Sequence, residues 1–192
     1  PSGERSPVLP PDAAFALFTS GSTGKPRLAL RSAASLIDEG QRYIDFHKLG
    51  SGSGIYGALP LQHAFGLGVT LPVALLSRAR LDLTQRFVPR KVLAAIQTEQ
   101  IDLLPIVPTM ARLLLKVSPE QVRTTSSLHV LIGAGPVSSH LSEAMLSCFG
   151  VRPSRGYGST ETGAVFGADR QQAASAAAFD PLPGVELQLG PK

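Results

Sequence analysis

Short apolar runs alternate with helical patterns over residues 28–149 of this 192-residue chain. The runs expected to form strands are 55–59, 79–83, 102–107 and 128–132, and a further run at 151–155 follows. Repeated strand–helix–strand order is typical of an α/β domain, in which a largely parallel sheet is flanked by helices. Ligands of such domains collect beyond the carboxyl ends of the strands. The sequence therefore predicts both a fold class and the edge of the sheet where binding residues should gather.

The expected helices each have one apolar face that would pack against the sheet. Ser32 can cap the first helix, and Pro89 can begin another at 89–100. On the first helix this face consists of Ala33, Leu36, Ile37, Gly40, Tyr43, Ile44 and His47. His47 is interpreted as a histidine that is either solvated or stabilised by the helix dipole, and not as a ligand. On the helix after strand 102–107 the face consists of Met110, Leu113, Leu114 and Val117.

The last expected helix would bury Leu141, Ala144, Met145 and Cys148, and Gly150 would end it. Cys148 is the only cysteine, which excludes an internal disulfide, and its apolar surroundings indicate a structural thiol. A single cysteine fits a reducing compartment, and we expect a cytoplasmic protein. Further along, we expect a surface loop at 171–178 and a final strand at 185–189.

A polar loop near the start of the chain separates two apolar runs. The first run, 14–18, has the composition of a buried strand. The loop itself reads Thr19-Ser20-Gly21-Ser22-Thr23-Gly24-Lys25-Pro26. Its glycines, hydroxyls, lysine and exposed backbone N–H groups suit an oligophosphate, although a solvated hairpin turn is the alternative. A Walker A loop is excluded, because Thr19 stands where that motif needs glycine and Pro26 where it needs serine or threonine.

A second candidate motif reads Tyr157-Gly158-Ser159-Thr160-Glu161. Tyr157 offers a ring face to a purine, and Thr160 offers a donor to a phosphate oxygen. Glu161 offers a hard oxygen ligand to Mg²⁺. The alternative is a turn in which a serine or threonine caps a helix.

In this order, the two stretches resemble motifs of the adenylate-forming superfamily, which includes acyl- and aryl-CoA synthetases, nonribosomal peptide synthetase adenylation domains and firefly luciferase. Its phosphate loop, Thr-Ser-Gly-Ser/Thr-Thr-Gly-x-Pro-Lys-Gly, matches residues 19–26 and departs at Arg27 and Leu28. Its Tyr-Gly-x-Thr-Glu motif matches residues 157–161. The resemblance implies that Tyr157 stacks on adenine, Thr160 contacts the α-phosphate and Glu161 helps to hold Mg²⁺. It also implies a phosphate-binding set of Thr19, Ser20, Gly21, Ser22, Thr23, Gly24 and Lys25.

Two further segments resemble the walls of that family's substrate pocket. Pro60-Leu61-Gln62-His63-Ala64-Phe65-Gly66 is similar to a Pro-Leu-x-His-x-x-Gly segment beside the acyl group. The resemblance places His63 or a neighbouring aromatic residue near the substrate carboxylate, and it gives His63, Thr160 and Glu161 as the catalytic residues. Taken alone, His63 would be an ordinary core or surface histidine. The second segment, Gly133-Ala134-Gly135, resembles the strand-end turn that lines the family's adenine and acyl pocket. The resemblance implies a pocket that comprises Phe65, Gly133, Ala134, Gly135, Gly156, Tyr157 and Gly158.

The resemblance implies that ATP and Mg²⁺ activate a small carboxylic acid as an acyl-adenylate. The acyl group would then pass to a thiol, either of coenzyme A or of the phosphopantetheine on a carrier protein. Two alternatives stay open: a degenerate module that binds nucleotide or acid without turnover, and an interaction scaffold. The 18 basic and 14 acidic residues give a net charge of +4 without a basic run, so no nucleic-acid partner is expected. No apolar run is long enough to span a membrane.

The resemblance covers nearly the whole chain but only the latter part of the family's large N-terminal domain. We expect a proline-rich lead-in or linker at 1–11 and the partial domain at 12–192. The family's ribose-binding aspartate and the small C-terminal domain with its catalytic lysine have no counterpart in this sequence. We therefore expect a piece of a longer protein, inactive by itself.

Overall fold

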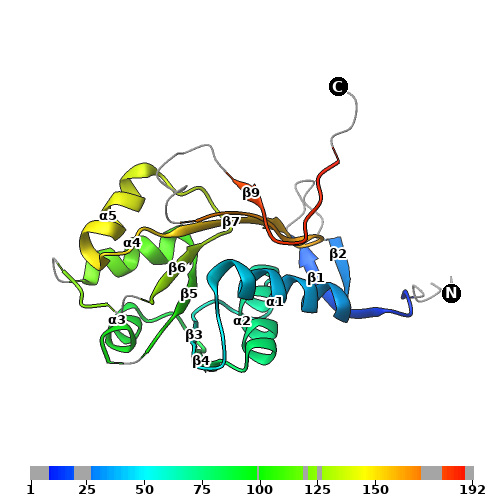
Figure 1. The fold of residues 1–192 in the computed structure, drawn as a ribbon, viewed down its shortest axis with the longest axis horizontal. Coiled ribbons are helices and arrows are strands. Elements are labelled where there is room, and N and C mark those ends of the chain that lie inside the picture. Colours follow the sequence, from blue (N-terminus) through cyan, green and yellow to red (C-terminus); the bar gives the residue numbers. More distant parts are fainter. Residues whose placement is uncertain are drawn as a thin grey trace, which may run out of the picture.

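The computed structural model describes residues 9–19, 27–98, 100–118, 121–124, 127–169 and 179–188 (Figure 1). Its larger sheet has the strand order β4–β3–β5–β6–β7–β8–β9. In chain order these are β3 (Gly54–Gly57), β4 (Arg80–Leu83), β5 (Leu103–Ile106), β6 (His129–Ile132), β7 (Ser154–Ser159), β8 (Gly163–Ala168) and β9 (Asp180–Pro181). The neighbours from β4 to β7 pair in parallel, and β8 and β9 continue the sheet in antiparallel fashion. The predicted α/β class with a largely parallel sheet is confirmed.

Helices cover both faces of this sheet (Figure 1). Because successive side chains of a strand point to opposite faces, Leu103 of β5 packs with one cluster, and Leu104 and Ile106 pack with another. The first cluster includes residues of α1 (Ala33–His47) and α2 (Ala64–Ser77), and the second includes residues of α3 (Pro89–Thr98), α4 (Pro108–Val117) and α5 (Ser139–Phe149). The buried apolar runs of β5 and β6 are thus explained by helices on both sides.

A separate hairpin precedes the sheet. Its strands β1 (Ala13–Thr19) and β2 (Arg27–Ser32) pair antiparallel, with Thr19 opposite Arg27. The expected strand at 14–18 exists, but the prediction that it is buried is wrong: Leu17 is the one buried residue of β1, which pairs with β2 and with no strand of the larger sheet. The loop that joins β1 to β2, residues 20–26, lies outside the described residues, as do residues 1–8 of the expected lead-in.

The ends of α1 and α5 follow the sequence signals. Ser32 caps α1 by accepting a hydrogen bond from the Ser35 N–H at 3.1 Å, and Gly150 ends α5 in the left-handed conformation. Cys148 is buried on the inner face of α5, as predicted.

Two predictions about helix faces are wrong in part. His47 is only 2% exposed, and its ring centroid lies 5.2 Å from that of His129. It is not solvated, because the last turn of α1 lies against the first residue of β6. On α4 the buried positions are Pro108, Ala111 and Leu114, whereas Leu113 and Val117 are exposed on the neighbouring face. Ile37 of α1 is exposed for the same reason.

The C-terminal strands differ most from the prediction. β7 begins later than expected and continues through Ser159, so it contains the Gly-Tyr-Gly-Ser segment that was expected to follow a strand. β8 was not predicted at all. Residues 185–188 form no strand, contrary to expectation, and residue 189 and the stretch 171–178 lie outside the described residues.

Candidate active site

A cavity of about 710 Å³ lies where β3, β6 and β7 end and their connections begin. Convergence at the carboxyl ends of parallel strands is what the α/β class predicts. The predicted site residues that line it are Thr19, His63, Phe65, Gly133, Ala134, Gly156, Tyr157, Gly158 and Thr160. Gly135 and Glu161 are not among its lining residues, and Ser20 to Lys25 fall in the part of the chain that is not described.

The connection after β6 packs against the start of α2. Gly133 is buried, and a Cβ at this position would lie 2.8 Å from Cζ of Phe65, so glycine allows the Phe65 ring to approach the backbone. Ala134 has a φ of 55°, a conformation that is uncommon outside glycine and tends to occur at functional sites. His63 precedes α2 and is exposed, and its side chain does not cap the helix.

Tyr157 stands on β7 with 62% of its surface exposed. Its ring is 6.0 Å from that of Phe166, its partner across the β7–β8 pair, and 6.4 Å from that of Phe179. The Arg155 guanidinium lies 4.7 Å from the Phe179 ring centroid. These contacts orient the Tyr157 ring and leave it accessible to a planar ligand.

A short turn joins β7 to β8 and carries Thr160 and Glu161. The Ser159 Oγ accepts a hydrogen bond from the Thr162 N–H at 3.2 Å, and the Thr162 Oγ1 accepts one from the Ser159 N–H at 3.3 Å. Hydrogen bonds from its own backbone N–H and from the Ser159 hydroxyl, together with the positive charge of Arg27, lower the pKa of Glu161. Glu161 is therefore an ionised carboxylate, and its side chain is exposed.

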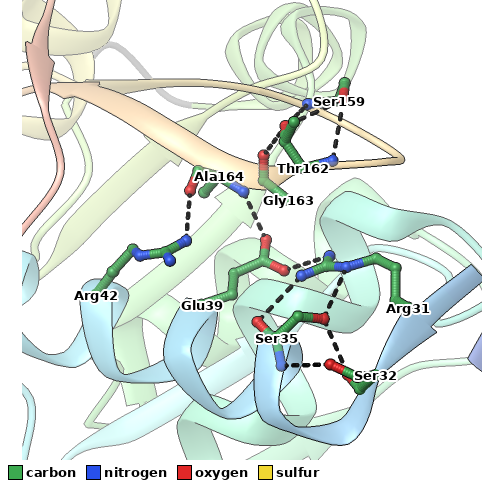
Figure 2. Close-up of polar contacts among 9 residues, drawn as sticks. All are labelled: Arg31, Ser32, Ser35, Glu39, Arg42, Ser159, Thr162, Gly163 and Ala164. Atoms are coloured by element: carbon green, nitrogen blue, oxygen red, sulfur yellow. Dashed lines mark hydrogen bonds and ion pairs between the residues drawn. The ribbon is translucent and has the colours of Figure 1, made fainter. Parts of the chain in front are cut away.

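Helix α1 supplies a wall of the cavity through Glu39 and Tyr43. The Glu39 carboxylate is buried and lies 2.7 Å from Nη1 of Arg31, while its other oxygen accepts a hydrogen bond from the Ala164 N–H at 2.9 Å (Figure 2). Burial and the nearby Glu39 charge raise the pKa of Tyr43 far above its usual value, so this phenol stays protonated.

Sequence reasoning missed the lining residues on α1 and β8. These are Glu39, Tyr43, Gly163 and Ala164, and the cavity is also lined by Phe18, Ala64 and Ser159. A signal for Glu39 was present: it is a carboxylate inside the apolar stripe of α1, between Leu36 and Tyr43. A buried charge requires a partner, so its position indicated a polar contact of α1.

Neither a cluster of metal-ligating residues nor a membrane-spanning helix is found within the described ranges. No group of three or more His, Cys, Asp or Glu residues is placed to hold a metal ion there. None of the helices described is both long enough and apolar enough to cross a membrane.

The fold and the cavity define a ligand-binding α/β domain, and comparison with known proteins gives its family. A family model described as AMP-binding enzyme matches residues 2–189. The chain belongs to this family of AMP-binding enzymes, as its motifs predicted.

Curated relatives of the chain are CoA ligases. Indoleacetate–CoA ligase of Aromatoleum aromaticum is 31% identical over 159 residues, which are 82% of this chain and 31% of the relative. Feruloyl-CoA synthase of an Amycolatopsis species is 32% identical over 156 residues, which are 81% of this chain and 32% of the relative. The chain therefore spans about a third of the length of these relatives.

Solved structures of the same family share the fold. ATP-bound MatB from Rhodopseudomonas palustris superposes with a TM-score of 0.81 at 26% identity, over 90% of this chain and 34% of that one. O-succinylbenzoate CoA synthetase from Bacillus subtilis, in complex with AMP, gives a TM-score of 0.77 at 25% identity, over 89% of this chain and 35% of that one.

Proposed function

We propose that the protein containing this chain uses ATP and Mg²⁺ to activate a carboxylic acid as an acyl-adenylate and then transfers the acyl group to coenzyme A. The observation that carries the proposal is the shared cavity: Thr19, at the edge of the loop 20–26, lines it together with Tyr157 and Thr160. A described residue of the first motif and two residues of the second, far apart in the sequence, thus line one cavity. The names of the relatives, which are CoA ligases, and the ATP bound to MatB support the same function.

The chemistry needs positioned charges rather than a protein nucleophile. A carboxylate oxygen of the acid attacks the α-phosphorus and pyrophosphate leaves; the thiolate of coenzyme A then attacks the acyl carbon and AMP leaves. Such steps depend on orientation and on stabilisation of developing charge. In this proposal Thr160 donates a hydrogen bond to the α-phosphate, His63 lies beside the carboxylate, and Tyr157 stacks on adenine. In the same proposal, the loop residues Ser20 to Lys25 bind the remaining phosphates.

Glu161 fits the role of the protein's ligand to Mg²⁺. Its lowered pKa keeps the carboxylate ionised, and its exposed side chain is accessible to an ion. Mg²⁺ is usually bound by one or two carboxylates together with substrate phosphates and water, so no cluster of acidic residues is required. Bound there, Mg²⁺ would neutralise charge on the phosphates.

The cavity walls favour an aromatic or similarly bulky acid. Phe18, Tyr43, Phe65, Ala64 and Ala164 contribute apolar surface to the cavity. Two relatives are named for indoleacetate and ferulate, both aromatic acids. We propose this class of substrate.

Acid-dependent exchange of labelled pyrophosphate into ATP tests the proposal. The full-length protein is assayed with indoleacetate, ferulate, benzoate, hexanoate and acetate, and the thioester is sought by mass spectrometry after addition of coenzyme A or a phosphopantetheinylated carrier protein. Exchange with aromatic acids and transfer to coenzyme A are expected. Nucleotide binding without exchange for any acid would identify a module that does not turn over, and transfer to the carrier protein alone would replace coenzyme A as the acceptor. No binding at millimolar ATP would refute the function.

A further inference from the structure

We propose that Arg31, Glu39 and Ala164, here called the clamp, position the β7–β8 hairpin relative to the strand that leaves the loop 20–26. The hairpin carries Tyr157 and Thr160, and β2 begins directly after the loop. The clamp would thus set the distance between the adenine-binding and phosphate-binding parts of the site. This inference rests on the proposed function, because it assumes that both parts contact one nucleotide.

Arg31 ties the end of β2 to the first turns of α1. Its Nη1 donates to Glu39 Oε2 at 2.7 Å, its Nη2 donates to the Ser35 carbonyl at 3.1 Å, and its Nε donates to the Ser35 Oγ at 3.3 Å. Arg31 is 3% exposed. All three guanidinium nitrogens therefore have acceptors on α1, and the direction of β2 is fixed relative to that helix.

Glu39 continues the connection to the hairpin. Its Oε1 accepts from the N–H of Ala164, the second residue of β8, across 125 positions of sequence. The carboxylate fits between two glycines, since a Cβ at Gly68 or at Gly163 would lie 2.4 or 2.5 Å from its oxygens. Helix α1 also binds the carbonyl of Ala164, because Arg42 Nη1 donates to it at 3.2 Å (Figure 2). Both backbone polar groups of Ala164 are thus held by one helix.

Stability alone is a poor explanation for this arrangement. Removing two charges from water is unfavourable, and apolar residues of similar size often serve a core as well as a buried ion pair does. The pair lies beside the cavity, and Glu39 lines it. Precise placement of the hairpin gives Glu39 a role that an apolar side chain could not fill, because only a hydrogen-bond acceptor can hold the Ala164 N–H.

Two double variants of the full-length protein separate positioning from packing. Arg31→Met/Glu39→Met removes both charges and the acceptor for Ala164. Arg31→Met/Glu39→Gln removes the charges but retains an amide oxygen that can accept from the Ala164 N–H. We expect the first to lower kcat for pyrophosphate exchange about 10- to 100-fold, since small misplacements of bound groups have effects of this size. The second should recover most of that loss, and hydrogen exchange in peptides covering 155–168 should be faster only in the first.

The surface pair Arg152 and Glu143, with nitrogen and oxygen 2.6 Å apart, provides the matched control. Arg152→Met/Glu143→Gln should leave kinetics and hydrogen exchange unchanged. If Arg31→Met/Glu39→Met does not fold, Arg42→Met tests the positioning role instead, because it removes the donor to the Ala164 carbonyl. This variant should lower kcat several-fold while its melting temperature stays near that of the wild type.

The outcomes separate the clamp from the proposed function. If the wild type catalyses exchange and the folded variants match it, or if the methionine and glutamine doubles lose activity equally, the clamp is refuted and the function stands. If the wild type neither binds ATP nor catalyses exchange with any acid, the function is refuted and the clamp with it.

Discussion

Replacement of Gly163 by alanine should destabilise the protein through two separable effects. Gly163 has a φ of 67°, a left-handed conformation that is unfavourable by about 1–2 kcal/mol for a residue with a Cβ. The added Cβ would also lie 2.5 Å from Oε2 of Glu39 and 2.8 Å from Nη1 of Arg31. Because both groups are buried, the methyl group must lengthen or displace their charge-assisted hydrogen bond, whose contribution is roughly 1.5–3 kcal/mol. We expect a total loss of about 2.5–5 kcal/mol in the free energy of unfolding.

Gly150 provides the control, since its φ is 66° and a Cβ there would meet nothing within 4 Å. Gly150→Ala should therefore lose only the backbone contribution of about 1–2 kcal/mol. The measurement is urea-induced unfolding followed by far-UV circular dichroism, because the chain has no tryptophan. Equal losses in the two variants would show that the Cβ at 163 does not disturb the ion pair, and the reasoning about the packing around Glu39 would be refuted.

The remaining predictions concern the residues proposed to contact the nucleotide. Glu161→Gln should raise the Mg²⁺ concentration needed for half-maximal exchange and lower kcat about a hundredfold. Since the pKa of Glu161 is lowered, the wild-type dependence on Mg²⁺ should persist until the pH falls below the usual value of 4.5; loss at higher pH would contradict this. Tyr157→Ala should weaken AMP binding in calorimetry by about 1–3 kcal/mol, and Tyr157→Phe should not. Alanine at Thr19, Ser20 and Ser22 should raise KM for ATP while the melting temperature is unchanged; a collapse of stability would instead make these residues structural.

Strands with helices on both faces were readily predicted from the sequence. Residues 103–106 and 130–132 are continuous apolar runs, and the structure shows why: neighbouring residues such as Leu103 and Leu104 belong to different clusters. The start of α1 and the end of α5 were equally clear, because Ser32 and Gly150 act through local hydrogen bonding and backbone conformation. These two helix ends could be predicted because their hydrogen bonds and backbone conformation involve only residues close together in the sequence.

The β7–β8 hairpin was not predicted from the sequence, and the reason is physical. Gly156 and Gly158 have little intrinsic preference for strands, so the predicted strand ended before them. In the structure, β6 pairs with Ser154 and Arg155, and β8 pairs with the glycine-containing remainder as far as Ser159. Pairing with neighbouring strands therefore overrides local preference, and the motif lies on a strand and its turn rather than in a loop.

In the candidate site too, residues that belong to a local motif could be predicted from the sequence, and contacts that depend on the fold could not. The motif residues Tyr157 and Thr160 could be predicted because they belong to one short motif whose residue types are recognisable together. Glu39 could be suspected, since a carboxylate in the apolar stripe of a helix must find a hydrogen-bond partner when it is buried. Of its two partners, Arg31 lies eight residues away and within reach of a sequence argument, whereas Ala164 contributes only a backbone N–H, which every residue except proline has. No side-chain pattern can identify such a partner. The contact that joins the two halves of the cavity is therefore specified by the fold, and only the charge that requires it is visible in the sequence.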